Sequence, residues 1–293
     1  MQSEKNRTQL AALPMSLWAL LFVGMSQWAL LFVGMSLLYI IGLSLLSRGE
    51  GFSSQGPLSL DNYARLGSPV YVKSLLLSMR LAGLTTLICL FMGYPFAYFI
   101  AKTRPRVRTW LLILLIAPFW TNALIRIYGW KILFYANGPL NTLLMRLGLI
   151  QRPLKLLYTE MSVLVGMVYA MIPFFVLPVY SSVERIDWTM VEASRDLGAS
   201  PLKAFLTVTV PMTAPGMVAG LVLTFIPSIG LFFISDLLGG SNTMLWGNLI
   251  HNELLKSHDM PFAATLSVVL LLLTGLIILL YRRMGGKAEN MFF

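Results

Sequence analysis

The chain has 293 residues, of which 57% are hydrophobic and 12% are charged, and its formal net charge is +10 at pH 7. This composition is that of an integral membrane protein and excludes an ordinary water-soluble domain. The basic residues gather beside apolar segments, where anionic lipid headgroups attract them, so the positive charge does not indicate a nucleic-acid partner.

Six apolar segments are long enough to cross a bilayer as helices, at about 20 residues each. They are Leu17–Leu46, Leu75–Ala101, Trp110–Phe134, Met161–Val183, Phe205–Ser235 and Pro261–Tyr281. We therefore expect an all-α integral membrane protein with six transmembrane helices. Basic residues crowd beside the first, second and last segments, at Lys5, Arg7, Lys102, Arg104, Arg106, Arg108, Arg282, Arg283 and Lys287. The positive-inside rule places those ends, and with them both termini, in the cytoplasm.

The first segment contains a tandem ten-residue repeat, SLWALLFVGM at Ser16–Met25 and SQWALLFVGM at Ser26–Met35. The repeat lengthens the apolar run to about 45 Å as a helix, whereas the hydrocarbon core is about 30 Å thick. Ten residues put the two copies out of phase on a helix, so only one register fits. We predict that Ser16–Met25 lies at the cytoplasmic interface or beyond the bilayer, and that a local duplication or a sequence artefact explains it better than a functional repeat.

The third segment combines aromatic faces with hydrogen-bonding groups. The candidate substrate-pathway residues in it are Phe119, Trp120, Asn122 and Tyr128. Aromatic faces bind cations, so a cationic substrate is one interpretation. An aromatic belt at the membrane interface is the other. Arg126 and Lys131 in the same segment argue against an uninterrupted negative pathway, unless they pair or reach the interface.

The stretch between the fourth and fifth segments is polar. Thr189 and Glu192 stand three apart, as in a capping box, so we expect a helix to begin there. Gly198 tolerates the left-handed conformation that ends a helix, and Ser200-Pro201 supplies a second N-cap with proline at the first helical position. The stretch is therefore predicted to form two short helices that meet at a glycine turn. Periodicity alone fits either a docking element or an ordinary interfacial helix.

Asp236 ends the fifth segment and is the acidic residue that we place closest to the membrane path. A carboxylate there would attract an organic cation, although a helix cap or a water-facing side chain is an equal alternative. His251, His258 and Glu253 match no strong metal motif, so we expect no metal site and no cofactor. No Gly-x-x-x-x-Gly-Lys phosphate loop is present, so the chain is not expected to hydrolyse ATP or to be an enzyme.

The loop resembles a family signature. Glu192-Ala193, Gly198 and Val208-Thr209-Val210-Pro211 resemble the cytoplasmic EAA signature of ABC importer permeases, with Ser194, Val208 and Val210 as conservative departures. The resemblance implies the type I ABC importer permease fold, in which this loop docks on an ATPase subunit. The ATPase-coupling residues that it implies are Glu192, Ala193, Gly198, Ser200 and Leu202.

A narrower resemblance runs from about Asp61 to about Tyr281. The stretches PFWTNALIRIYGWKILFYANGPLN, IPFFVLPVYSSVERID and SDLLGG are similar to the spermidine/putrescine permease family of ABC importers, and to the first of its two permease subunits. This likeness implies a multi-pass protein of the bacterial inner membrane that takes up polyamines. The implied partners are a second permease subunit, an ATPase dimer, a periplasmic polyamine-binding protein and membrane lipid.

Two other functions stay open at this stage. The same permease role for an opine, an amino-acid derivative or a metal complex is the first, and an ion-coupled secondary carrier is the second. The carrier is disfavoured because no segment contains a pair of carboxylates that could relay protons.

The topology divides the chain into four parts. Residues 1–47 hold the cytoplasmic N-terminus and the elongated first transmembrane segment with its repeat, and 48–73 form a periplasmic link. Residues 74–281 form the transmembrane permease core with the cytoplasmic coupling loop at 184–205, and 282–293 form a cytoplasmic tail.

Overall fold

The computed structural model describes residues 28, 31–49, 56–240 and 243–283. All secondary-structure elements in these ranges are helices, apart from a single isolated β-bridge that pairs Leu46 with Leu58. Four continuous helical runs are long and apolar enough to cross a membrane. They are α3 (Pro69–Lys102), α7 (Glu160–Glu184), α13 (Met260–Arg283) and the run Pro201–Gly230, which joins α9 (Pro201–Ala204), the π-helical segment η2 (Phe205–Thr209) and α10 (Val210–Gly230).

The expected third span is broken by a sharp bend. α4 (Pro105–Ile116) and the 3₁₀ turn η1 (Ala117–Trp120) lead into α5 (Ala123–Phe134) and α6 (Pro139–Arg146), and the two halves are bent by 94°. The side chain of Asn122 accepts a hydrogen bond from the Leu124 amide at 2.8 Å, so it caps α5 as a new helix. The expected segment Trp110–Phe134 therefore contains a break, and the helices on its two sides count as a single span only as a bent pair.

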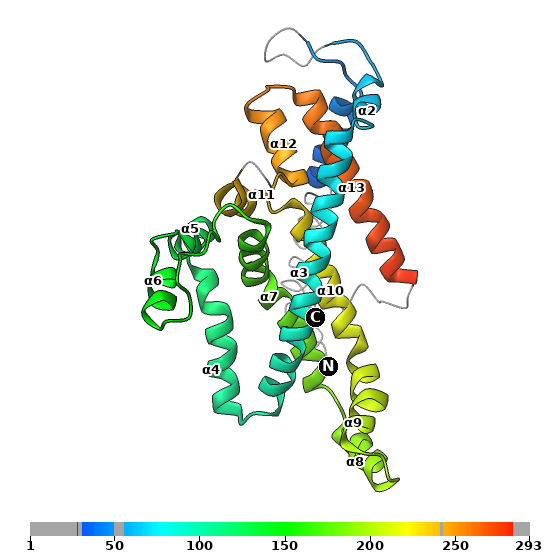
Figure 1. The fold of residues 1–293 in the computed structure, drawn as a ribbon. Helices are drawn as coiled ribbons and strands as arrows, with labels where there is room; N and C mark the ends of the chain where they lie inside the picture. The colour runs from blue at the N-terminus through cyan, green and yellow to red at the C-terminus, as the bar shows by residue number, and fades with distance from the viewer. Residues whose placement is uncertain (1–27, 29–30, 50–55, 241–242, 284–293) are drawn as a thin grey trace, which may run out of the picture.

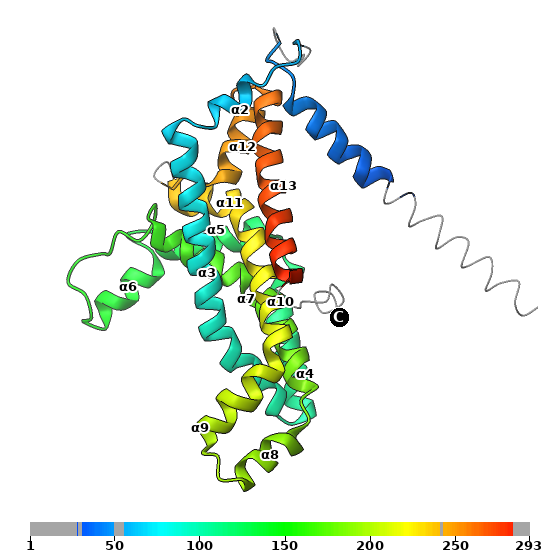
Figure 2. The same cartoon turned by 90° about the vertical axis from the view of Figure 1, so that its right-hand side faces the viewer.

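The first expected segment contains a shorter apolar helix, Leu31–Ser44. With it and the bent pair, the described residues are compatible with six spans. This helix is blue in Figure 2 and runs outward from the rest of the protein. Its large side chains lack cover within the chain, as Phe32 at 75% exposure shows. The prediction for the repeat copy Ser16–Met25 lies outside the described residues.

Three helices, α3, α7 and α10, form the centre of the protein (Figure 1). They approach closely where glycines face a buried ring. A Cβ added at Gly93 of α3 would lie 2.7 Å from the ring of Phe175 on α7, and one added at Gly220 of α10 would lie 3.0 Å from the same ring. Small residues let membrane helices pack closely, so these two glycines fix the spacing of the central bundle.

The two ends of the bundle carry different elements. α8 (Trp188–Asp196) and α9 project at the lower end in Figure 1, and α2 (Asp61–Arg65) and α12 (Trp246–Leu255) cover the upper end. Between α10 and α12 the chain passes through α11 (Phe232–Ile234) and the π-helical segment η3 (Ser235–Gly239). The polar loop predicted between the fourth and fifth segments thus stands apart from the upper end.

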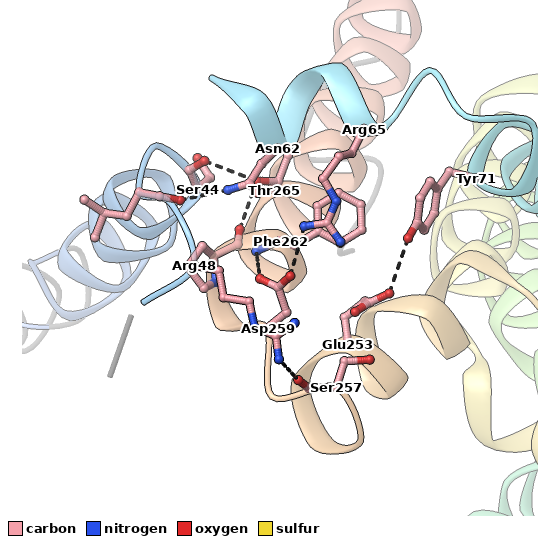
Figure 3. A network of polar contacts seen from close by, with 12 residues as sticks. Ser44, Arg48, Asn62, Arg65, Tyr71, Glu253, Ser257, Asp259, Phe262 and Thr265 are labelled. Carbon is pink, nitrogen blue, oxygen red and sulfur yellow. Dashed lines mark hydrogen bonds and ion pairs between the residues drawn. The ribbon is translucent and has the colours of Figure 1, made fainter. Parts of the chain in front are cut away.

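A polar network closes the upper end of the protein (Figure 3), and we call it the end clamp. Its hydrogen bonds join Ser44 to Tyr63 (2.8 Å), Asn62 to the Leu46 carbonyl (2.8 Å), Thr265 to the Ser44 carbonyl (3.2 Å) and Arg48 to the Ser257 carbonyl (2.9 Å). The buried carboxylate of Asp259 pairs with Arg65 at 2.9 Å and accepts from the Phe262 amide at 3.1 Å. The clamp therefore connects the end of the Leu31–Ser44 helix to α2 and α13.

Candidate functional site

The lower loop begins with a helix cap that differs from the predicted one. α8 starts at Trp188, and the carboxylate of Asp187 is its N-cap. The amide and the hydroxyl of Thr189 both donate to Asp187, at 3.0 Å and 2.7 Å. The predicted capping box of Thr189 and Glu192 is wrong because Thr189 uses its hydroxyl as a donor to Asp187. Hydrogen bonds from the Thr189 side chain and backbone hold the pKa of the Asp187 carboxyl below its ordinary value.

Replacing Asp187 by alanine is expected to raise the hydrogen-exchange rates of the amides in the first turn of α8 by about fivefold, the usual consequence of losing an N-cap. Asp187→Asn keeps an acceptor oxygen and is the matched control, with rates within about twofold of the parent. A carboxyl with a lowered pKa stabilises the helix above its unfolded-state pKa and loses that effect as the pH falls through the folded pKa. The protection factors of the amides in this turn are therefore expected to be the same at pH 7 and pH 5. Exchange rates in Asp187→Ala equal to those of the parent would contradict the assigned cap.

The turn between α8 and α9 has the predicted geometry. Gly198 has a φ of +88°, in the left-handed region. Its amide donates to the Arg195 carbonyl at 2.9 Å and the next amide, of Ala199, donates to the Ser194 carbonyl at 3.1 Å. This pair of bonds is the Schellman motif, which requires the left-handed residue. Ser200 then caps α9 by accepting from the Lys203 amide at 3.3 Å, with Pro201 at the first helical position, as predicted.

The five candidate coupling residues lie together on this loop, and all are exposed. They are Glu192, Ala193, Gly198, Ser200 and Leu202. Apolar side chains beside them also face outward, with Leu197 at 90% and Leu202 at 68% exposure. An exposed apolar patch with charged neighbours is typical of a protein–protein docking surface. The loop therefore presents two exposed leucines among and beside the five candidate coupling residues.

The residues at the two ends of the loop, Trp188 and Phe205, pack against α3. This packing was not predicted from the sequence. Lys102 lies over the ring of Trp188 at 4.4 Å and over that of Tyr98 at 4.9 Å. Tyr94 and Tyr98 make edge contacts with Phe205, the first residue of η2, at centroid distances of 5.9 Å and 5.7 Å. The spacing of four between Tyr94, Tyr98 and Lys102 places them on one face of α3 and is the signal that was missed. These contacts join the start of α8 and the start of η2 to the same face of α3.

The candidate pathway residues are not assembled into one site. Trp120 is 81% exposed, Asn122 caps α5 and Tyr128 is half-exposed near Lys131, whose ammonium lies 5.7 Å from its ring centroid. Of the five candidates, Phe119 alone lines the cavity beside the bend. Asp236 lies apart from the other four, in η3.

The cavity beside the bend has a volume of about 160 Å³ and lies between η1, α5, α7 and α11. Its walls are mostly apolar and aromatic, and they include Phe119, Ile127, Tyr169, Met171, Phe174 and Phe233. Arg126 enters this wall from α5, with its guanidinium 4.2 Å from the Phe119 ring centroid and 5.9 Å from that of Tyr169. Its Nε and Nη1 atoms are buried and have no hydrogen-bond partner. We call this the Arg126 cavity.

Asp236 is held in a polar corner near the upper end. The Asn248 amide of α12 donates to the Asp236 carboxylate and, at 3.0 Å, to the carbonyl of Phe232. Asp236 is itself exposed, so its charge is accessible. The ring of His251 stacks on Phe232 at 4.7 Å. Within the described residues, no group of three His, Cys, Asp or Glu side chains is arranged to hold a metal ion.

Comparison with known proteins gives a consistent result. The family model of the binding-protein-dependent transport system inner membrane component matches residues 93–286. The spermidine/putrescine transport system permease protein PotB of Escherichia coli strain K12 is 47% identical over 246 residues, covering 84% of this chain and 90% of that protein. PotB of Haemophilus influenzae is 41% identical and covers 84% of this chain and 86% of its own length.

Solved structures show the same fold at low identity. A bacterial ABC transporter involved in the import of the acidic polysaccharide alginate matches with a TM-score of 0.75 and 16% identity, covering 95% of this chain and 98% of that chain. The MetNI methionine ABC transporter in an inward-facing conformation matches with a TM-score of 0.55 and 17% identity, over 73% of this chain and 93% of that chain. At this identity the likeness concerns the fold.

Proposed function

The chain belongs to the family of binding-protein-dependent transport system inner membrane components, and we propose that it is the transmembrane permease subunit of an ATP-driven ABC importer that takes up polyamines. The observation that carries the proposal is the 47% identity to the spermidine/putrescine permease PotB over 84% of the chain. The protein is a multi-pass membrane protein and a transport subunit, with ATP hydrolysis left to a partner.

The chemistry of the described residues suits this cargo. A polyamine consists of several ammonium groups on an apolar stem, and aromatic faces with a few carboxylates bind such cations. Phe119, Trp120, Asn122 and Tyr128 near the bend, and Asp236 in η3, are the proposed contacts along the pathway. Asp236 is exposed, and its carboxylate is oriented by Asn248, so it is placed to attract an ammonium group.

The lower loop is the proposed contact with the ATPase dimer. Glu192, Ala193, Gly198, Ser200 and Leu202 would dock on the ATPase subunits, and the Schellman turn would hold them in fixed orientation. The fold also implies a second permease subunit and a periplasmic binding protein that delivers the polyamine. In this assembly both termini of the chain and the loop lie on the cytoplasmic side, where the basic residues gather.

The test is ATP hydrolysis by the complete importer in lipid nanodiscs, with its binding protein, as spermidine and putrescine are titrated separately. Stimulation by either polyamine is the expected result. An opine, an amino acid and an alginate oligosaccharide serve as comparison solutes at the same concentrations. A complex that assembles but ignores polyamines and responds to one of these solutes would keep the permease role and reject the cargo. Uptake by the chain without an ATPase would reject the ABC mechanism.

A further inference from the structure

In the Arg126 cavity, a positive charge that belongs to the protein, the guanidinium of Arg126, contacts aromatic rings that could equally bind the cation of a ligand. The ring contacts of the guanidinium are with Phe119 and Tyr169, and Phe119 makes an edge contact with Phe174 at 5.7 Å. The ion pairs within the described part of the chain use other arginines, namely Arg65, Arg80 and Arg108. Arg126 is therefore held by aromatic faces, without a carboxylate partner among these residues.

The contact between the Arg126 guanidinium and the aromatic rings is weak enough for another cation to replace the guanidinium. Two guanidinium nitrogens, Nε and Nη1, have given up water without gaining an acceptor, which disfavours the position. A cation over an aromatic face gains a factor of about 2 to 30 in an equilibrium constant. The net preference of Arg126 for the cavity is consequently small, and an ammonium group that reaches the same rings competes on similar terms.

We propose that Arg126 is a tethered substitute for the cargo, whose guanidinium occupies the aromatic site in the cavity until an ammonium group of a polyamine displaces it. The inference rests on the proposed function, since it requires a cationic cargo. Exchange of one cation for another keeps the charge of the site constant, whereas simultaneous occupancy is opposed by repulsion at a separation of a few ångströms. Under this exchange, a cation occupies the aromatic rings both before and after the polyamine arrives.

Because Arg126 lies beside the bend, the exchange requires movement of its side chain only. Its amide donates to the Asn122 carbonyl at 3.3 Å, which places Arg126 one turn into α5 from the break in the span. The guanidinium can leave the rings by side-chain rotation at this first turn while α7, which carries Tyr169 and Phe174, stays in place. A small inorganic cation meets the same repulsion and has no apolar stem to contact the rings, so it is expected to displace Arg126 less effectively than a polyamine does.

The experiment compares Arg126→Met with the parent importer in nanodiscs, using spermidine as the probe and ATP hydrolysis as the readout. Removing the competing cation is expected to lower the half-stimulating spermidine concentration by about tenfold, within the range that one cation–aromatic contact provides. Arg126→Gln, which keeps a hydrogen-bond donor in the cavity, is measured alongside and is expected to shift in the same direction. Arg80→Met is the charge control: it removes one positive charge and an exposed ion pair with Glu160 (3.1 Å) from α3, outside the Arg126 cavity, and no shift is expected.

A second readout tests the tether directly. Methylguanidinium added to Arg126→Ala is expected to raise the half-stimulating spermidine concentration toward the parent value, and to have a smaller effect on the parent, where Arg126 already competes for the rings. An unchanged concentration in assembled Arg126→Met or Arg126→Gln would overturn the inference. A raised concentration would also overturn it, since it would mean that Arg126 pairs with an anionic group of a partner. Absence of any response to spermidine in the parent would instead reject the cargo itself.

Discussion

Gly198→Val is expected to leave ATP hydrolysis by the importer running while polyamine uptake falls about tenfold, because a β-branched residue in the left-handed region costs about 1–2 kcal/mol. Gly198 has a φ of +88° and its amide completes the turn between α8 and α9. Valine would drive the turn out of this conformation and separate the two halves of the coupling loop. The measurement is the ratio of spermidine transported to ATP hydrolysed in proteoliposomes.

The matched control for this variant is Ala199→Val. It adds a β-branched side chain at the next position, whose backbone is not left-handed, so the ratio should stay within about twofold of the parent. Apart from the two neighbours of Gly198 in the chain, no atom of the residues that the structure describes lies within 4 Å of a Cβ built at Gly198, so the effect in Gly198→Val comes from backbone conformation and not from a clash. An unchanged ratio in Gly198→Val would contradict the assignment of the turn as the coupling element.

Asp236→Asn is expected to lower polyamine uptake by about tenfold or more while assembly is preserved, since a carboxylate attracts an ammonium at contact distance by about 1–4 kcal/mol. The asparagine oxygen can still accept from the Asn248 amide, so the packing between η3 and α12 should persist. Uptake into proteoliposomes measures the effect, and size-exclusion chromatography of the complex checks assembly.

Asp61→Asn is the control for the loss of one negative charge. Asp61 is exposed in the first turn of α2, a helix that carries none of the proposed pathway residues. Normal uptake in Asp61→Asn and reduced uptake in Asp236→Asn would place Asp236 on the pathway. Normal uptake kinetics in Asp236→Asn would show that Asp236 is not part of the substrate pathway.

The helical architecture was predictable because long apolar runs have few other stable forms in lipid. The bend in the third span was not predicted, because hydropathy averaged over Trp110–Phe134 carries no information about direction. Its local signals are present in the sequence, in Pro118 of the 3₁₀ turn and in Asn122 as an N-cap. Each is also compatible with a merely kinked helix, so the 94° angle depends on packing that the sequence does not display.

The lower loop was predicted better at its turn than at its start. Gly198 and Ser200-Pro201 have few alternative uses at these positions, and the structure confirms both. At the start of α8, Asp187 and Thr189 are each able to cap a helix, and the choice of Asp187 is a matter of one short hydrogen bond. Local patterns thus identify a cap more securely where a single residue type can supply it.

The Arg126 cavity could be predicted only in part. Phe119 and Arg126 are close in sequence and lie in the same apolar segment, whereas Tyr169, Phe174 and Phe233 come from other helices. Their convergence depends on the bend and on the break at Leu231, where α10 ends. The π-helical segments η2 and η3 were likewise invisible, because a single widened turn leaves the hydrophobic pattern almost unchanged.

The end clamp sets an order of events during synthesis. Thr265 reaches Ser44 across 221 positions, and Arg65 reaches Asp259 across 194. A ribosome adds about 5–20 residues per second, so Ser44 waits on the order of ten to forty seconds before its partner exists. During that interval the Ser44 carbonyl and the Arg65 guanidinium must be satisfied by water or by the insertion machinery. Closure of the clamp is therefore a late event in biogenesis, because it requires α13, the last helix that the structure describes.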